Sequence, residues 1–500
     1  MRKKSIRIIA FAVCALILCG CRKAPDKDVV TSKNNGVLQE KIYETESSEA
    51  VQGIGPSKIQ WNEEFTSTDG SVSFSVNIDN EVSPDVKQVV EVVPHMLTEE
   101  DIQRVATVLL GDVDFYERRT SSNPAYSKSQ YQEMINRLSA YASQDSLAEL
   151  MGDSDAEVYL EFVHDYIEYW TKGYETASDE DPRTPCDWTL KKERYYNDDP
   201  IEIGSRTLAE DDDVLYANAQ KNDIEYIYSV TRRTDRNPKL NQISLQLSEG
   251  LGLMPVDTAI YRSKLCRTEK PTEEQVEAVR QKAQEMLDEM ELGQWQITEC
   301  SAKTDYIGIG ADDPVEYTIH VEAEPKFNGI STIEGQSSEK LQDAYAPTYL
   351  MTETTFEFSA NGDIIYFVLN SPLDVLEVPN ENVKTISVAE LTDKCKQQLT
   401  LSDADAYGLP SDVRKEIEDA QGEKLLCQVE ISEAEYGFGR VKVPDTDDNY
   451  YYIPVLAFRG VVNYVTDQTG SVYYSNGTGE SDEKLPILVC INAIDGSIIQ

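Results

Sequence analysis

Apolar and polar residues alternate in the first part of the chain beyond residue 57. The alternating apolar positions are Val72, Phe74, Val76 and Ile78. A spacing of two is typical of a strand with one buried face. Thr68-Asp69-Gly70 supplies turn residues between this run and the earlier apolar residues Trp61 and Phe65. The pattern therefore predicts a β-hairpin, and Val89 to Val93 predicts a further strand that Pro94 ends.

Other segments have the spacing of three and four that is typical of helices. Thr98, followed by Glu99, Glu100 and Asp101, predicts a helix start, and Gly111 marks its end. A polar side chain before an acidic first turn satisfies free backbone N–H groups. Residues 129–172 are also predicted to be helical. Further helices are predicted to begin at Thr272, ending by Gly293, and at Ser387.

The second half of the chain repeats one order of elements. Each copy has a helix, two long antiparallel strands and a closing hairpin with an Asn/Asp/Gly turn. The first copy places its strands at 294–303, 314–324, 354–360 and 364–369, and the second at 424–436, 451–465, 485–491 and 497–499.

These patterns predict an α+β fold with an N-terminal mixed domain and two helix-plus-antiparallel-sheet units. The predicted boundaries are 58–266 for the mixed domain, 267–383 for the first unit and 384–500 for the second. Residues 21–57 are polar, with Tyr43 as their single aromatic residue. They are predicted to form a flexible tether with a reach of about 30 to 35 Å.

Residues 1–20 have the layout of a signal peptide. Basic residues precede an apolar run from Ile8 to Leu18, which is too short to cross a bilayer that needs roughly twenty residues. Leu18-Cys19-Gly20-Cys21 resembles the lipobox of bacterial lipoproteins. The resemblance implies cleavage between Gly20 and Cys21 and lipid on Cys21. The expected location is the extracytoplasmic face of the cell membrane.

The end of the chain carries a second resemblance. Residues 452–456 together with Asn492-Ala493-Ile494-Asp495-Gly496 are similar to the final hairpins of PepSY-like domains. The resemblance covers about 110 residues and implies a curved antiparallel sheet around a helix, in modules that mostly bind or inhibit proteins. The order from the lipobox to the terminal hairpin also resembles an uncharacterised family of large lipoproteins from Gram-positive gut bacteria, which implies no activity.

The charge of the chain limits its partners. It has 46 Lys and Arg against 90 Asp and Glu, a net charge of −44. Removal of residues 1–20 takes away four basic residues and no acidic ones, which leaves −48. Such acidity argues against nucleic acid and against attraction to anionic lipid. Solubility and mutual repulsion explain it best. Cationic partners or weakly held Ca²⁺ are the alternative.

No set of residues predicts catalysis, a cofactor or a metal centre. Histidine is confined to His95, His164 and His320, and no G-x-S-x-G motif marks a nucleophile. The best cluster lies on one helical face but lacks a facing E-x-x-H partner, so a solvated face is favoured. This cluster is Glu157, Glu161, His164 and Glu168.

Two segments begin like calcium-binding loops but depart from the EF-hand pattern. Residues 445–449 begin like an EF-hand, but Tyr450 replaces the glycine and Leu456 the glutamate. Asp403 and Asp405 begin another, with Arg414 at its end. Both are interpreted as turns, and a weak calcium site between acidic loops stays open.

Glycine, tyrosine and cysteine complete the candidates. Gly308-Ile309-Gly310 and Gly437-Phe438-Gly439 are expected to be turns or bulges, since a dinucleotide loop needs a third glycine. The dense tyrosines favour core packing over a binding platform; they are Tyr166, Tyr169, Tyr174, Tyr195, Tyr196, Tyr450, Tyr451, Tyr452, Tyr473 and Tyr474. Disulfides and single buried thiols both fit the six widely spaced cysteines; these are Cys186, Cys266, Cys300, Cys395, Cys427 and Cys490.

These observations predict one of two functions. The first is a membrane-anchored, non-catalytic protein of the cell envelope that binds a protein or another ligand. The lipobox, the tether, the repeated units and the lack of a catalytic set support it. The alternative is an envelope hydrolase acting on peptide or glycan, which would need two carboxyl groups lining one cleft.

Overall fold

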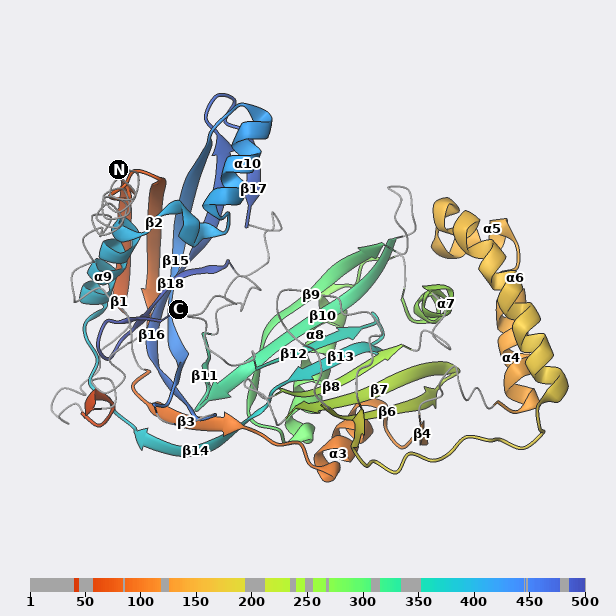
Figure 1. Cartoon of the computed structure of the whole chain (residues 1–500). Coiled ribbons are helices and arrows are strands. Elements are labelled where there is room, and N and C mark those ends of the chain that lie inside the picture. The colour runs from red at the N-terminus through yellow and green to blue at the C-terminus, as the bar shows by residue number, and fades with distance from the viewer. Residues whose placement is uncertain are drawn as a thin grey trace, which may run out of the picture.

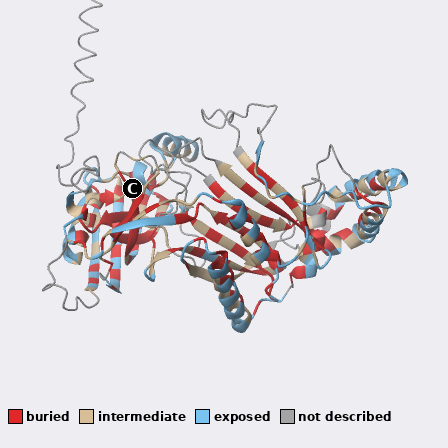
Figure 2. Cartoon of the chain, turned by 90° about the horizontal axis from the view of Figure 1, so that it is seen from below, coloured by how far each residue is buried: buried red, intermediate tan, exposed pale blue. Residues whose placement is uncertain are grey.

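A computed structural model describes residues 40–44, 57–83, 86–117, 126–193, 212–233, 240–247, 255–266, 269–306, 315–333, 352–444, 446, 448–476 and 485–499. The fold is mixed α/β, and about 31% of the described residues are in helices and 43% in strands. Two large sheets lie side by side, and a group of helices stands beyond the second sheet (Figure 1). Figure 2 shows that buried residues are concentrated in the sheets, whereas the helices keep exposed outer faces.

The first sheet joins the two ends of the described chain. Its strands are β1 (Ser57–Thr66), β2 (Val72–Val82), β3 (Val89–Pro94), β14 (Leu373–Asn380), β15 (Leu425–Lys442), β16 (Tyr450–Thr466), β17 (Val472–Ser475), β18 (Ile487–Asn492) and β19 (Ile498–Ile499). The main order is β1-β2-β15-β16-β18-β19. The predicted hairpin of β1 and β2 is confirmed, and β2 then pairs in parallel with β15. Helix α9 (Val388–Leu401) covers this sheet, followed by η2 (Ala404–Tyr407) and α10 (Ser411–Gln421).

The second sheet is built from the middle of the chain. Its strands are β4 (Phe115–Glu117), β5 (Lys191–Glu193), β6 (Asp212–Lys221), β7 (Ile224–Arg233), β8 (Leu240–Leu247), β9 (Trp295–Tyr306), β10 (Val315–Phe327), β11 (Ile330–Ser331), β12 (Glu353–Phe358) and β13 (Ile364–Asn370). The main order is β11-β10-β12-β13-β8-β7-β6-β4, with β9 beside β10 and β5 beside β6. Helices α3 (Glu99–Leu110) and α8 (Glu273–Met290) share one core with these strands.

Capping residues begin these helices where the sequence predicts. The Thr98 hydroxyl accepts from the Asp101 backbone N–H, and the Asp101 carboxylate accepts from the Thr98 N–H, which forms a capping box. Thr272 and Gln275 make the same arrangement at α8. The helical stretch predicted over 129–172 is three helices: α4 (Lys128–Ser139), α5 (Gln144–Met151) and α6 (Asp153–Thr176). They share a separate core with α7 (Pro255–Leu265).

The repeated units have the same strand order. In the first unit β9, β10, β12 and β13 pair antiparallel in sequence, and in the second β15, β16, β18 and β19 do so. Each closing turn has a glycine with positive φ, Gly362 at 80° and Gly496 at 75°. However, strand pairing crosses the predicted boundaries at 266 and 383. The 58–266 region supplies β1 and β2 to the first sheet and β6 to β8 to the second.

The six cysteines that follow Cys21 all lie in the described part of the chain, and none of them forms a disulfide. Cys395, Cys427 and Cys490 are buried. Burial raises the pKa of the Cys427 thiol to about 11 and that of Cys490 to about 12, and it raises that of Cys395 well above its usual value. Only the thiolate is an effective nucleophile, so these thiols are expected to be inert.

We therefore expect Cys395, Cys427 and Cys490 to resist Ellman's reagent at pH 8 in the folded protein and to react once guanidinium unfolds it. Their folded-state pKa values lie above the unfolded value of about 8.5, so the stability that the protonated thiols contribute is present below that pH and lost as pH rises through the folded values. Mass spectrometry would assign the modified residues. Rapid labelling of Cys395 or Cys490 without denaturant would contradict the prediction.

Candidate functional site

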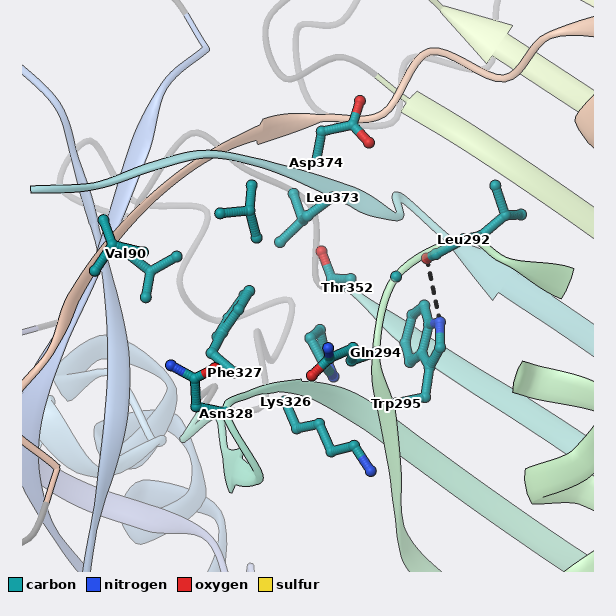
Figure 3. Close-up of a pocket in the computed structure, with 14 residues that line it drawn as sticks. Val90, Leu292, Gln294, Trp295, Lys326, Phe327, Asn328, Thr352, Leu373 and Asp374 are labelled. Atoms are coloured by element: carbon teal, nitrogen blue, oxygen red, sulfur yellow. Dashed lines mark hydrogen bonds between the residues drawn. The ribbon is translucent and has the colours of Figure 1, made fainter. Parts of the chain in front are cut away.

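A pocket of about 250 Å³ lies where the two sheets meet (Figure 3). One side is a two-stranded ribbon of β3 and β14, which leads from the first sheet to the second. The other side is the Leu292–Trp295 segment before and at the start of β9, together with the end of β10. The site is therefore built by segments distant in sequence.

Hydrogen bonds fix the β3–β14 ribbon between the sheets. β3 pairs on one edge with β16 and on the other with β14. The pairing continues past the strand ends, because the His95 N–H donates to the Pro372 carbonyl at 2.8 Å. The chain thus crosses between the sheets twice along one path, once after β3 and once before β14.

A second contact holds the sheets together below the ribbon. The Ile333 N–H donates to the Phe438 carbonyl of β15 at 2.6 Å. The rings of Phe327 and Tyr452 have centroids 4.7 Å apart. Gly437 permits this approach, because a Cβ there would lie 2.8 Å from Ile333.

This placement corrects one sequence prediction. Gly437 and Gly439 were expected in a turn or bulge, but both lie inside the long strand β15. Their physical role is close approach: a Cβ on Gly439 would meet Val455 at 2.6 Å. Glycine in a strand interior often marks such a crossing. Gly308 and Gly310 lie outside the described residues.

The pocket has an apolar wall and a few polar groups. Trp295, Phe327, Val90 and Leu373 form much of the apolar wall (Figure 3). The Trp295 indole N–H donates to the Leu292 carbonyl at 3.2 Å, which fixes the ring. The polar lining residues are Gln294, Lys326, Asn328, Thr352 and Asp374. This mixture suits a largely apolar ligand that is oriented by few polar contacts.

Polar residues from both sheets support the pocket floor. The buried Arg440 of β15 donates to the Thr352 hydroxyl at 3.1 Å. Its guanidinium carbon also lies 5.4 Å from the centroid of the Tyr452 ring. Stacking on an aromatic face suits a guanidinium. Asn328 at the rim donates to the Gln88 side chain, which precedes β3, at 2.5 Å.

His95 bridges two carboxylates beside the pocket. Its Nδ1 lies 2.9 Å from Asp374 of β14, and its Nε2 lies 3.1 Å from Asp101 of α3. The Arg104 side chain also donates to Asp101, at 2.5 Å, which extends this network of hydrogen bonds. Both imidazole nitrogens are therefore engaged by carboxylates. A histidine that activates a nucleophile needs one nitrogen directed at that nucleophile, so this arrangement is suited to holding the ribbon against α3.

Asp101 is ionised more readily than an ordinary aspartic acid. Burial raises its pKa, but hydrogen bonds from the Thr98 hydroxyl and N–H and from His95 outweigh burial and lower it overall. The ionised carboxylate is thus favoured in the folded state. Its contribution to stability is present above the unfolded pKa of about 3.9 and is lost as the pH falls through the lower folded value.

Strand β14 leaves three large apolar side chains exposed at the rim. Val375 is 53% exposed, Leu376 is 52% and Val378 is 40%. In the described part of the chain β14 pairs with β3 alone, so its other edge has no strand beside it. A free edge with apolar side chains is a ready template for another strand.

The other residues singled out in the sequence do not gather at this site. Gly20 and Cys21, with the rest of residues 1–39, lie outside the described residues. Glu157, Glu161, His164 and Glu168 form an exposed face of α6, where Glu168 pairs with Lys172 at 2.5 Å. His320 contacts its neighbour Glu322 at 2.9 Å. Within the described ranges no His, Cys, Asp and Glu side chains form a group that could hold a metal ion.

The remaining candidates have structural roles where they are described. Asp405 pairs with Arg414 at 2.7 Å, and the Asp403 side chain caps η2. Tyr450, Tyr451 and Tyr452 are buried, as core packing predicts. By contrast, Tyr169 and Tyr473 are exposed. Asp445, Asp447, Tyr195 and Tyr196 lie outside the described residues.

Sequence reasoning missed the pocket and the β14 edge. The run Leu373-Asp374-Val375-Leu376-Glu377-Val378 was a detectable signal, because it is apolar, strand-like and bounded by Pro372 and Pro379. What the sequence does not reveal is that β14 becomes an edge. Edge position depends on which strands pair, and β14 pairs with a strand almost three hundred residues earlier.

Comparisons with known proteins give only distant likenesses. The sequence matches no protein-family model and no curated protein. Among solved structures, an uncharacterized protein from Eubacterium rectale is similar over 93% of this chain and 98% of its own, at 11% identity and a TM-score of 0.33. The Bacillus megaterium YpeB C-terminal domain is similar over 53% of this chain and 88% of that domain, at 10% identity and a TM-score of 0.21. Structural similarities at these low TM-scores do not indicate a function for this protein.

Proposed function

We propose that this protein is a non-catalytic binding protein of the cell envelope and that an extended apolar segment of a partner protein binds along β14. The observation that best supports this proposal is the free edge of β14. Val375, Leu376 and Val378 are exposed there, beside a pocket with a mainly apolar wall. Backbone hydrogen bonds to β14 would supply affinity, and the pocket would select side chains.

The geometry of the site supports a rigid binding surface. β16 pairs with one side of the ribbon, and the His95 side chain holds the ribbon against α3. The hydrogen bond from the His95 N–H to the Pro372 carbonyl joins the two strands of the ribbon at their end. A partner strand would therefore meet a preformed edge, which lowers the entropy cost of binding. Asp374 is the one carboxylate among the residues lining the pocket.

The proposed location follows from the lipobox. Residues 1–20 would be removed, and lipid on Cys21 would anchor the protein at the extracytoplasmic face of the membrane. The predicted tether is shorter than 21–57, because residues 40–44 pack on the first sheet, where Ile42 is buried and its carbonyl accepts from the Asn380 side chain at 2.8 Å. Residues 21–39 would hold the two sheets away from the surface. In the described part of the chain no helix is long and apolar enough to cross a membrane.

A photo-crosslinking amino acid at Val375 or Val378 tests the binding surface. We expect irradiation of cells that carry either variant to give one discrete higher-mass adduct on a gel, because the partner segment lies against these side chains. Mass spectrometry of the adduct would identify the partner peptide.

The matched control places the same amino acid at Val413 of α10, which is also 40% exposed but lies on the first sheet's helix layer, away from the ribbon. Equal adducts at Val413 and Val378, or none at either β14 position, would contradict the proposal. Hydrolysis of envelope peptide or glycan by the purified protein would favour the alternative function.

A further inference from the structure

A second pocket, also of about 250 Å³, lies at the end of the second sheet that carries the β6–β7 and β12–β13 turns. Three lysines from three elements line it. Lys221 ends β6, Lys264 lies in the last turn of α7, and Lys282 lies in the middle of α8. Asp363, in the β12–β13 turn, is the one carboxylate in the lining.

The charge of this pocket is opposite to that of the chain. Three ammonium groups and one carboxylate give a local charge of +2, whereas the whole chain carries −44. Like charges that gather in one small space repel one another, and a bound anion would offset this repulsion.

The carboxylate does not neutralise the lysines by direct pairing. Lys221 and Lys264 make no ion pair with any described residue, and Lys282 donates instead to the Gly362 carbonyl at 2.6 Å. Asp363 accepts from the Ser359 hydroxyl at 3.5 Å. Burial and the nearby Lys282 ammonium lower the pKa of Lys221.

The elements that present the lysines are fixed. Asn222 and Asp223 adopt positive φ in the β6–β7 turn, which lets Lys221 end its strand beside the pocket. Arg262 of α7 pairs with Glu316 at 3.0 Å and Glu357 at 3.2 Å, which holds the helix turn that carries Lys264. Lys282 is held by its own hydrogen bond to the closing turn. Preformed positive groups of this kind favour binding of an anion.

We propose that this pocket binds a small organic anion with at least two negative charges, its phosphate or carboxylate groups among Lys221, Lys264 and Lys282. The remaining lining gives the body of the ligand an apolar wall of Ile224, Leu265 and Met286. The volume limits the ligand to a compact molecule and excludes a polymer chain from full burial. This site is independent of the β14 surface.

Isothermal titration calorimetry of the exported chain with pyrophosphate and with citrate, at constant ionic strength, tests the proposal. We expect one saturable site per chain for at least one of these anions, and the arm that binds identifies phosphate or carboxylate as the preferred group. The bound anion should also raise the thermal unfolding temperature.

Lys264→Gln is the most direct variant, because Lys264 makes no hydrogen bond to the described chain. We expect it to weaken binding roughly tenfold or more, the loss expected when a hydrogen bond to a charged group is removed. Lys415→Gln on α10 makes the same charge change at an exposed site remote from the pocket and should bind as the wild type does.

Two results would overturn the proposal. One is the lack of saturable binding by both anions. The other is an equal effect of Lys264→Gln and Lys415→Gln, which would show that only the overall charge matters. If Lys264→Gln alters folding, Lys221→Gln can be measured in its place, because Lys221 lies on β6 and Lys264 on α7.

Discussion

Phe74→Ala is expected to lower the free energy of unfolding by about 3 to 5 kcal/mol, the usual cost of removing a buried phenylalanine ring. Phe74 is 2% exposed and lies on β2. Its ring stacks on Phe65 at 4.9 Å and contacts Tyr407 edge-on at 6.0 Å. It therefore fastens the N-terminal hairpin to the C-terminal unit, and a cavity here would loosen a core that is formed from both ends of the chain.

Guanidinium unfolding followed by circular dichroism would measure this loss. Phe162→Ala is the matched control, because Phe162 is 46% exposed on α6 and its removal should change stability by less than about 0.5 kcal/mol. If Phe74→Ala unfolded no more easily than Phe162→Ala, the parallel attachment of β2 to β15 would not be an essential part of the core.

Arg262→Met is expected to lower the free energy of unfolding by about 3 kcal/mol. Its guanidinium contacts Glu316 and Glu357 at the end of the second sheet, and the Glu316 side chain is 4% exposed. Methionine has a similar length but no charge, so the buried Glu316 carboxylate would lose its main compensating charge. Removal of one partner from a buried ion pair is strongly destabilising for this reason.

The same unfolding experiment would measure the effect, and two further variants separate charge from packing. Adding Glu316→Gln to Arg262→Met should recover part of the lost stability, because it removes the buried negative charge that Arg262 no longer offsets. Lys172→Met, which breaks the exposed pair with Glu168, should leave the transition in place. No recovery in the double variant would mean that Arg262 acts by packing alone.

Local elements were predictable because local rules decide them. The Thr68–Gly70 turn, the Thr98 and Thr272 helix starts and the closing hairpins at Gly362 and Gly496 each follow from turn chemistry, capping or alternation within a few residues. The repeated order of a helix and four strands was also visible, because each unit repeats the same local pattern.

The candidate sites were not predictable in the same way. Pocket residues such as Val90, Trp295 and Asp374 come from three segments, of which the first lies about two hundred residues or more before the other two. The three lysines of the second pocket likewise come from β6, α7 and α8. Each residue alone has ordinary surface or core chemistry, so no local pattern distinguishes it.

By itself, the sequence determined the N-terminal hairpin, the capped helix starts and the closing turns, that two units share one order, and that the chain carries a lipobox resemblance at Cys21. The tertiary structure alone decided that β2 joins β15, that β8 joins β13 and that β14 becomes an edge. The physical reason is that backbone hydrogen bonding between strands is the same for every sequence. Partner choice therefore depends on how all the apolar faces are buried together.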